Sequence, residues 1–151
     1  DWQQEGCAAY QQMVSRLRTA GEMAKQEGII IGIRTGMDAK FDKKLLKKVG
    51  SSQIKVYYNF QDAADHHRDI CKELRKLGAQ RIVQIHASNT DSVNLQEDPE
   101  INLPKIRKML DKMKWSGWLV VERSRDVKRV RDVKYNFGRN IAYLKQVFQE
   151  R

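Results

Sequence analysis

The chain alternates between segments with a helical hydrophobic period and short segments that are almost entirely apolar. Apolar residues recur at helical spacing over 7–27, and Gly28 follows where a helix commonly ends. The next run, 29–33, is short and rich in β-branched residues, which is typical of a strand buried on both faces. A second helical segment over 42–49 ends at Gly50. The first fifty residues therefore predict helix, strand, helix.

The same alternation of strand and helix continues along the rest of the chain. Strands are predicted over 54–60, 81–86 and 118–122, and helices over 63–77, 103–113 and 136–148. This strict alternation predicts an α/β fold with four parallel strands and five helices, in one domain over 1–151. An open doubly wound sheet and part of a closed (β/α)8 barrel both fit the pattern. No GxGxxG follows the first strand, so a dinucleotide-binding fold has no positive signal.

Polar or charged side chains follow every predicted strand. The carboxyl ends of parallel strands carry the chemistry in both architectures, so these residues are the candidate site. They are Arg34, then Asn59 and Asp62, then His86 and Asn89, then Glu122, Arg123 and Arg125. Imidazole and carboxylate groups bind divalent metals, which makes His86 and Glu122 candidate ligands, with an oxygen from Asn59. Taken alone, a His at a strand end is more often a hydrogen-bonded structural residue.

The net charge of +10 lies mainly in two basic runs, over 40–48 and 123–139. Acidic residues interrupt the second run, and it lacks the interleaved aromatic residues of a single-strand stacking platform, so nucleic acid is not the favoured partner. No apolar stretch approaches the length of a membrane span. Cys7 and Cys71 fit no metal or redox motif and are expected to be buried or half-buried thiols. We expect a soluble protein of a reducing compartment, and the cytoplasm is favoured.

Four segments resemble the sugar phosphate isomerase/epimerase family, which are TIM barrels related to xylose isomerase. They are IKVYYNFQDA (54–63), RIVQIHASNTD (81–91), WSGWLVVERSRD (115–126) and YNFGRNIAYLKQVF (135–148). The resemblance covers nearly the whole chain but only the C-terminal half of the expected barrel. It implies that about half of a (β/α)8 barrel is present.

The resemblance also implies a set of roles at the strand ends. In the family, a divalent cation such as manganese is held by a Glu, an Asp, a His and a second Glu from successive strands, and the two glutamates move a proton between neighbouring carbons. His86 matches the ligand His, and Glu122 matches the second Glu, as ligand and as acid/base. Asn59 stands where the Asp is expected, and Arg34 stands where the first Glu is expected.

These departures bear on the metal. The family's set has three carboxylates, whereas here Glu122 alone remains and Arg34 adds a permanent positive charge, so the formal charge of the four positions is zero. A divalent metal such as manganese is the cofactor that the resemblance implies, and its absence is the alternative that these replacements at Arg34 and Asn59 favour. We hypothesise that Arg34 forms a bidentate pair with Glu122 in the metal's place.

Three functions stay open from the sequence. One is a sugar or sugar-phosphate isomerase/epimerase, with Arg34, Arg123, Arg125 and Asn89 binding the substrate. The second is a non-catalytic or engineered half-barrel scaffold with a disabled site. The third is nucleic-acid processing, as in the endonuclease-IV branch, whose rich set of histidine and acidic ligands three histidines can hardly supply. In each case two open sheet edges predict a homo-oligomer or pairing with a missing N-terminal half.

Overall fold

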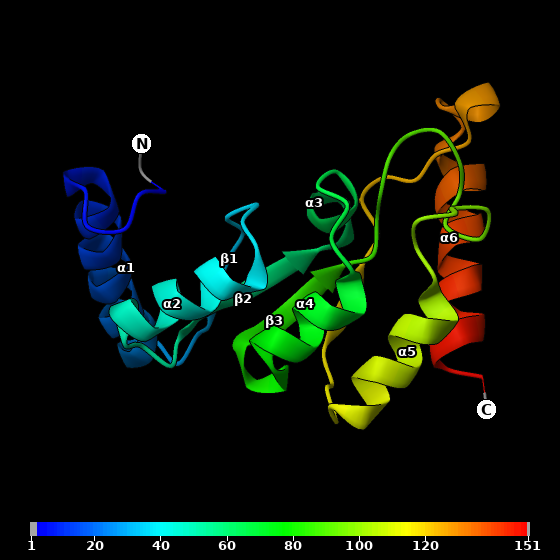
Figure 1. Ribbon diagram of the computed structural model, residues 1–151. Helices are drawn as coiled ribbons and strands as arrows, with labels where there is room; N and C mark the ends of the chain where they lie inside the picture. The colour runs from blue at the N-terminus through cyan, green and yellow to red at the C-terminus, as the bar shows by residue number, and fades with distance from the viewer. Residues whose placement is uncertain (1–2, 151) are drawn as a thin grey trace.

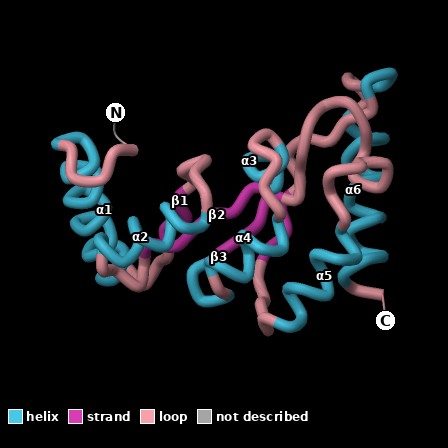
Figure 2. Tube along the Cα trace, in the orientation of Figure 1, coloured by secondary structure: helices cyan, strands magenta, loops and turns pink. Residues whose placement is uncertain are grey.

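A four-stranded parallel sheet, covered by helices along one side, forms the protein in the computed structural model, which describes residues 3–150 (Figures 1 and 2). The strands are β1 (Ile31–Ile33), β2 (Ile54–Asn59), β3 (Ile82–His86) and β4 (Trp118–Val120). The helices are α1 (Ala8–Gln26), α2 (Ala39–Val49), α3 (Phe60–Ala64), α4 (Ile70–Leu77), α5 (Leu103–Lys112) and α6 (Val133–Phe148), with short 3-10 turns η1 (Ala79–Arg81) and η2 (Val127–Arg129).

The strands lie in the order β1-β2-β3-β4, which is also their order in the chain. Every neighbouring pair is parallel. A doubly wound sheet reverses its strand order at a switch point and carries helices on both faces, and this sheet does neither. Sequential order with helices outside is the arrangement of a TIM barrel, so the predicted half barrel is confirmed.

Local signals explain where the helices begin and end. The side chain of Asp38 accepts from the Phe41 N–H at 2.7 Å and caps α2, which ends at Gly50 in the left-handed conformation (φ 73°). The helix predicted over 63–77 is instead two helices, so residues 3–150 contain six α-helices rather than the five predicted. The side chain of Asn59 caps the start of α3, and the side chain of Asp69 caps the start of α4. Each of the two helices therefore begins at a cap of its own.

The core lies between the sheet and the helices. Ile54, Val56 and Tyr58 of β2 alternate as buried residues on the helix side, together with Ile85 of β3. Leu74 of α4 is fully buried against them. One side of the sheet therefore carries the hydrophobic layer that holds the helices.

The other side of the sheet is open. Trp118 of β4 is 78% exposed, and Tyr57 and Gln84 are only half-buried. The expectation that 29–33 is buried on both faces is wrong, since Ile29 and Ile30 precede β1 and are 53% and 47% exposed, and no residue of β1 itself is buried. The reason is that β1 is an edge strand, paired with β2 alone among the described residues.

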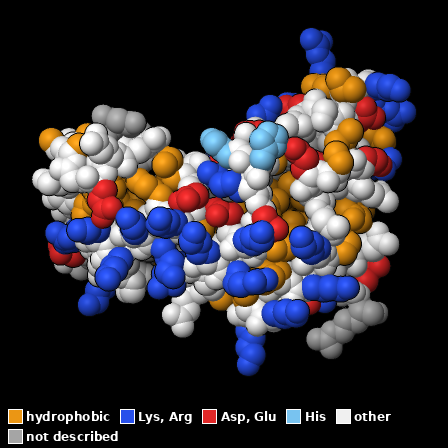
Figure 3. All heavy atoms as spheres, viewed as in Figure 1, with side chains coloured by type: hydrophobic (Ala, Val, Ile, Leu, Met, Phe, Trp, Pro, Cys, Tyr) orange, Lys and Arg blue, Asp and Glu red, His pale blue; other side chains and the backbone are white. Residues whose placement is uncertain are grey.

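Positive charge is concentrated on the outer helices. Together α2, α4 and α5 carry twelve Lys or Arg against three acidic residues, so these three helices have a net charge of +9. Two of those acids, Asp42 and Glu73, are buried. Figure 3 shows the resulting band of Lys and Arg across this face. Over residues 3–150, no helix is long and apolar enough to cross a bilayer.

Candidate functional site

The predicted site residues gather at the carboxyl ends of the strands. The β2–β3–β4 register places Asn59 opposite His86 and His86 opposite Val120, two residues before Glu122. Arg34 follows β1 at the same end of the sheet. The fold thus brings these polar groups to one rim.

His86 and Glu122 form the central pair of this rim. The imidazole Nδ1 lies 3.0 Å from Glu122 Oε2, and the Tyr57 hydroxyl also contacts the ring. Burial lowers the pKa of His86, with the positive charge of Arg34 acting in the same direction and the Glu122 carboxylate opposing both. The imidazole is therefore neutral at neutral pH and donates from Nδ1 to a carboxylate that is 49% exposed.

Arg34 pairs with Asp62 and not with Glu122, so the hypothesised bidentate pair with Glu122 is wrong. The guanidinium donates from Nε and Nη2 to the two Asp62 oxygens, at 2.8 and 2.6 Å. Asp62 lies on α3, directly after the neighbouring strand β2, so it is within reach of an arginine side chain. Glu122 follows β4, three strands away, at a distance of about 14 Å between strand axes.

Asn59 is turned into the protein. Its Oδ1 accepts from the Gln61 N–H at 2.8 Å, and its Nδ2 is buried without a hydrogen-bond partner among the described residues. The cavity that it lines beside Arg34 and Tyr58 has a volume of about 10 Å³, close to that of one water molecule. The metal-ligand oxygen predicted from Asn59 is thus already used to cap α3.

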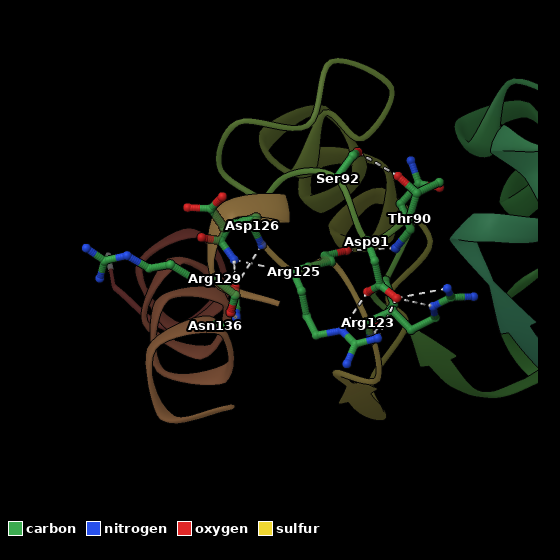
Figure 4. Close-up of polar contacts among 12 residues, drawn as sticks. Thr90, Asp91, Ser92, Arg123, Arg125, Asp126, Arg129 and Asn136 are labelled. Carbon is green, nitrogen blue, oxygen red and sulfur yellow. Dashed lines mark hydrogen bonds and ion pairs between the residues drawn. The ribbon is translucent and has the colours of Figure 1, made fainter. Parts of the chain in front are cut away.

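Asp91 holds two of the predicted substrate-binding arginines (Figure 4). Arg123 approaches its carboxylate to 2.9 Å and Arg125 to 2.5 Å. Their hydrogen bonds and charges, those of Arg125 foremost, lower the pKa of Asp91 to about 2. One carboxylate between two guanidinium groups leaves a surplus positive charge beside the rim.

Asn89 is buried, although the sequence predicted a contact with substrate. It is 1% exposed, and its Nδ2 donates to Asp98 and Glu100 at 2.9 and 3.0 Å. Its backbone N–H donates to the Ser124 hydroxyl at 2.8 Å. This geometry ties the loop after β3 to the loop after β4 and keeps Asn89 from the surface.

Two residues that hold the site in place, Ser88 and Asn140, were not predicted from the sequence. The Ser88 hydroxyl accepts from the backbone N–H of Glu122 at 2.8 Å and of Arg123 at 3.2 Å, and so positions the carboxylate. Asn140 of α6 is buried, accepts from the Leu95 N–H and donates to the Ser124 carbonyl. A signal existed for Asn140, because it lies four residues before the buried Leu144 and so interrupts the apolar face of a helix.

The groups present do not fit a divalent metal. Within residues 3–150, no three His, Cys, Asp or Glu side chains lie close enough together to hold an ion. Asp62 is neutralised by Arg34, and the Asn59 oxygen is occupied. The remaining pair, His86 and Glu122, bond to each other.

The two cysteines lie apart from the site. Cys7 is half-buried and caps α1, Cys71 is buried in α4, and neither forms a disulfide.

Comparison with known proteins identifies the fold. The family model for xylose isomerase-like TIM barrels matches residues 1–147. By sequence, no curated protein matches the chain.

Solved structures of the same fold are distant in sequence. D-psicose 3-epimerase from Clostridium cellulolyticum H10 superposes with a TM-score of 0.74 at 14% identity, over 92% of this chain and 56% of that one. A 3-keto-D-glucoside 4-epimerase from E. coli gives 0.69 at 10% identity, over 88% and 52%. An AP endonuclease of family 2 from Brucella melitensis gives 0.68 at 17% identity, over 89% and 57%. The chain therefore spans about half the length of these proteins.

Proposed function

Since this chain belongs to the family of xylose isomerase-like TIM barrels, we propose that it is an isomerase/epimerase-like half barrel that binds a sugar or sugar phosphate at the carboxyl ends of its strands. The observation that carries the proposal is the His86–Glu122 pair at the ends of neighbouring strands, with Arg34 on the same rim. A carboxylate, a neutral imidazole and a guanidinium offer the acceptors and donors that sugar hydroxyls need. The surplus charge of Arg123 and Arg125 suits a phosphate group.

The same residues can move a proton without a metal. The half-exposed Glu122 carboxylate takes a proton from the carbon beside a carbonyl, while His86 holds it in place through Nδ1–H. Arg34 bonds Asp62 through Nε and Nη2, so Nη1 remains to donate to an enediolate oxygen. One carboxylate can return the proton to the neighbouring carbon on the same face. Inversion at a single carbon requires a second group on the opposite face.

A binding protein without turnover is the second candidate. The Arg34–Asp62 ion pair favours it, because this pair neutralises one of the two carboxylates on the rim. Exchange of substrate protons with deuterated water separates the two candidates. Deuterium entering the carbon beside the sugar carbonyl supports the isomerase/epimerase, and saturable binding with no exchange supports the binding protein.

Calorimetry on the full chain tests both candidates against a role unrelated to sugars. The probes are D-tagatose and D-fructose 6-phosphate, each with EDTA and with manganese. We expect saturable binding with EDTA present, no gain with manganese, and a loss of about tenfold or more for Glu122→Gln, since a hydrogen bond to a charged group is removed. Glu27→Gln, an exposed position after α1, is the matched control and should bind as the parent does. Absence of binding to both probes would refute the proposal, and micromolar manganese binding that Glu122→Gln abolishes would refute its metal-free site.

A further inference from the structure

We propose that the groove between α2 and the start of β3, at the amino ends of the strands, binds a small molecule or a lipid headgroup that carries two or more phosphate groups. The groove lies at the opposite end of the strands from the rim of His86 and Glu122, and the proposal does not depend on the proposed function. Its volume is about 570 Å³, which is within the range of small-molecule sites. Its lining includes four basic side chains, those of Lys43, Lys47, Lys55 and Arg81.

The charged residues that line this groove are all positive. Four other cavities of residues 3–150 each have at least one Asp or Glu in their lining, whereas the described residues that line this groove include none. None of its four cations belongs to an ion pair within residues 3–150. Lys55 is half-buried, so its charge is partly removed from water with no carboxylate to compensate it. An anionic ligand supplies the missing negative charge.

The usual reason for basic residues at this end of the strands does not account for these cations. Helices end here, and cations near a helix end neutralise the partial negative charge of its last carbonyl groups. In α2 those carbonyls already accept from Arg18 of α1, at 2.8 and 3.3 Å, and in α4 the Leu77 carbonyl accepts from Arg81 at 2.9 Å. Lys43 lies in the middle of α2 and Lys55 lies on β2, so neither of them neutralises a helix end.

Two serine residues add hydrogen-bond donors of the kind that phosphate oxygens accept. Ser51 and Ser52 follow α2 and line the groove. The Ser51 Oγ accepts from the backbone N–H of Gln53 at 3.2 Å, which leaves its own O–H to donate to a ligand. Hydroxyl and ammonium donors together bind phosphate oxygens well. A single phosphate carries a charge of about −2, so a ligand with several phosphate groups matches the four cations best.

The place of the groove makes it independent of the open edges of the sheet. It is formed at the starts of β2 and β3, which are the two inner strands. Strands that continue a barrel pair with β1 or β4, so the residues that form the groove stay in place. The described lining includes no aromatic side chain, so a nucleobase has no stacking partner there. The expected ligand is therefore a compact polyphosphate or a phosphorylated headgroup rather than a nucleotide.

Calorimetry with inorganic tripolyphosphate tests the site, in about 0.15 M sodium chloride so that weak surface attraction is screened. We expect saturable binding, at least about tenfold tighter than that of inorganic phosphate, because a single phosphate meets fewer of the cations. The double variant Lys43→Gln/Lys47→Gln should weaken binding about tenfold or more, since two charged donors are lost. Lys72→Gln/Lys76→Gln is the matched control, because it removes the same charge at the same spacing from exposed positions of α4, and it should bind as the parent does. Absence of tripolyphosphate binding, or an equal loss in both double variants, overturns the proposal.

Amide chemical shifts of isotope-labelled protein locate the bound ligand. Tripolyphosphate should shift the amide resonances of Ser51, Ser52 and Arg81, which line the groove. Shifts confined to the other end of the strands, around Arg123 and Arg125, would overturn the site even if the ligand binds tightly.

Vesicle co-sedimentation identifies the source of the phosphate groups. Binding to phosphatidylcholine vesicles that contain a phosphatidylinositol bisphosphate, but not to phosphatidylserine vesicles of equal charge, supports a lipid headgroup. Binding of tripolyphosphate with no binding to either vesicle supports a free polyphosphate. Equal binding to both kinds of vesicle, weakened equally by the two double variants, shows only a general attraction of the basic helices and overturns the site.

Discussion

Replacement of the buried Asp42 by Asn should make the protein more stable at neutral pH. Asp42 lies on α2, is 5% exposed, and accepts a hydrogen bond from the Thr35 hydroxyl at 2.6 Å. Burial raises its pKa from 3.8 to about 6, with the charges of Glu73 and Asp38 adding to the shift and the Thr35 bond and Arg68 opposing it. The folded state therefore binds the Asp42 proton more tightly than the unfolded state does.

The sign and size of the effect follow from this difference. Stability from this group is fully present below pH 3.8, declines as the pH rises, and is lost above about pH 6. At ~1.4 kcal/mol for each pKa unit, the ionised carboxylate costs about 3 kcal/mol at pH 7.5 relative to a neutral group. An Asn side chain stays neutral and still accepts from Thr35. We expect Asp42→Asn to gain about 2–3 kcal/mol in unfolding free energy at pH 7.5 and less than about 1 kcal/mol at pH 4.

Urea denaturation of both proteins at pH 4, 5, 6 and 7.5 measures this gain. The difference between the two curves isolates Asp42 from other titrating groups, such as His86, whose lowered pKa removes stability as the pH falls. Asp111→Asn, the same substitution at a 65% exposed carboxylate of α5, should show no comparable dependence on pH. An Asp42→Asn protein that is less stable than the parent at pH 7.5, or a gain that does not change with pH, would refute the reasoning.

Three further substitutions probe the loops that hold the rim. Ser88→Ala should lose about 1–2 kcal/mol in urea and speed amide hydrogen exchange at Glu122, whose N–H loses its acceptor; unchanged exchange at that amide would contradict the role. Asn140→Ala should cost about 2–4 kcal/mol, because the Leu95 N–H and a loop carbonyl are left buried and unpaired, and a cost near zero would show that water replaces the side chain. Asp91→Asn should lower stability above pH 4 and converge with the parent toward pH 2, because the lowered pKa gives stability that protonation removes. A constant deficit over that range, measured by urea titration, would argue against the arginine pairing.

Much of the fold follows from local patterns. The helical period of 7–27 and the capping signals at Asp38 and Gly50 are short-range features, so the elements they predict are present. The break in the helix predicted over 63–77 was not predicted, because Asp69 acts as an N-cap only when the chain turns before it. Its sequence alone is compatible with a continuous helix.

The site was less predictable than the fold. Strand order places residues on the rim, and His86 and Glu122 were therefore found correctly as neighbours. The partner of Arg34 depends on distance across the sheet, and the hypothesis of a pair with Glu122 ignored the three strand spacings between β1 and β4. The burial of Asn89 depends on a loop of which the sequence carries no periodic signal.

The net charge of +9 on α2, α4 and α5 makes the helix-covered side of the molecule strongly positive. A protein with such a face adsorbs to an anionic matrix in a preferred orientation, with its helices against the support. The open sheet face then points into solution. Protein immobilised on a cation exchanger at low salt is thus displayed with its rim accessible to a soluble ligand.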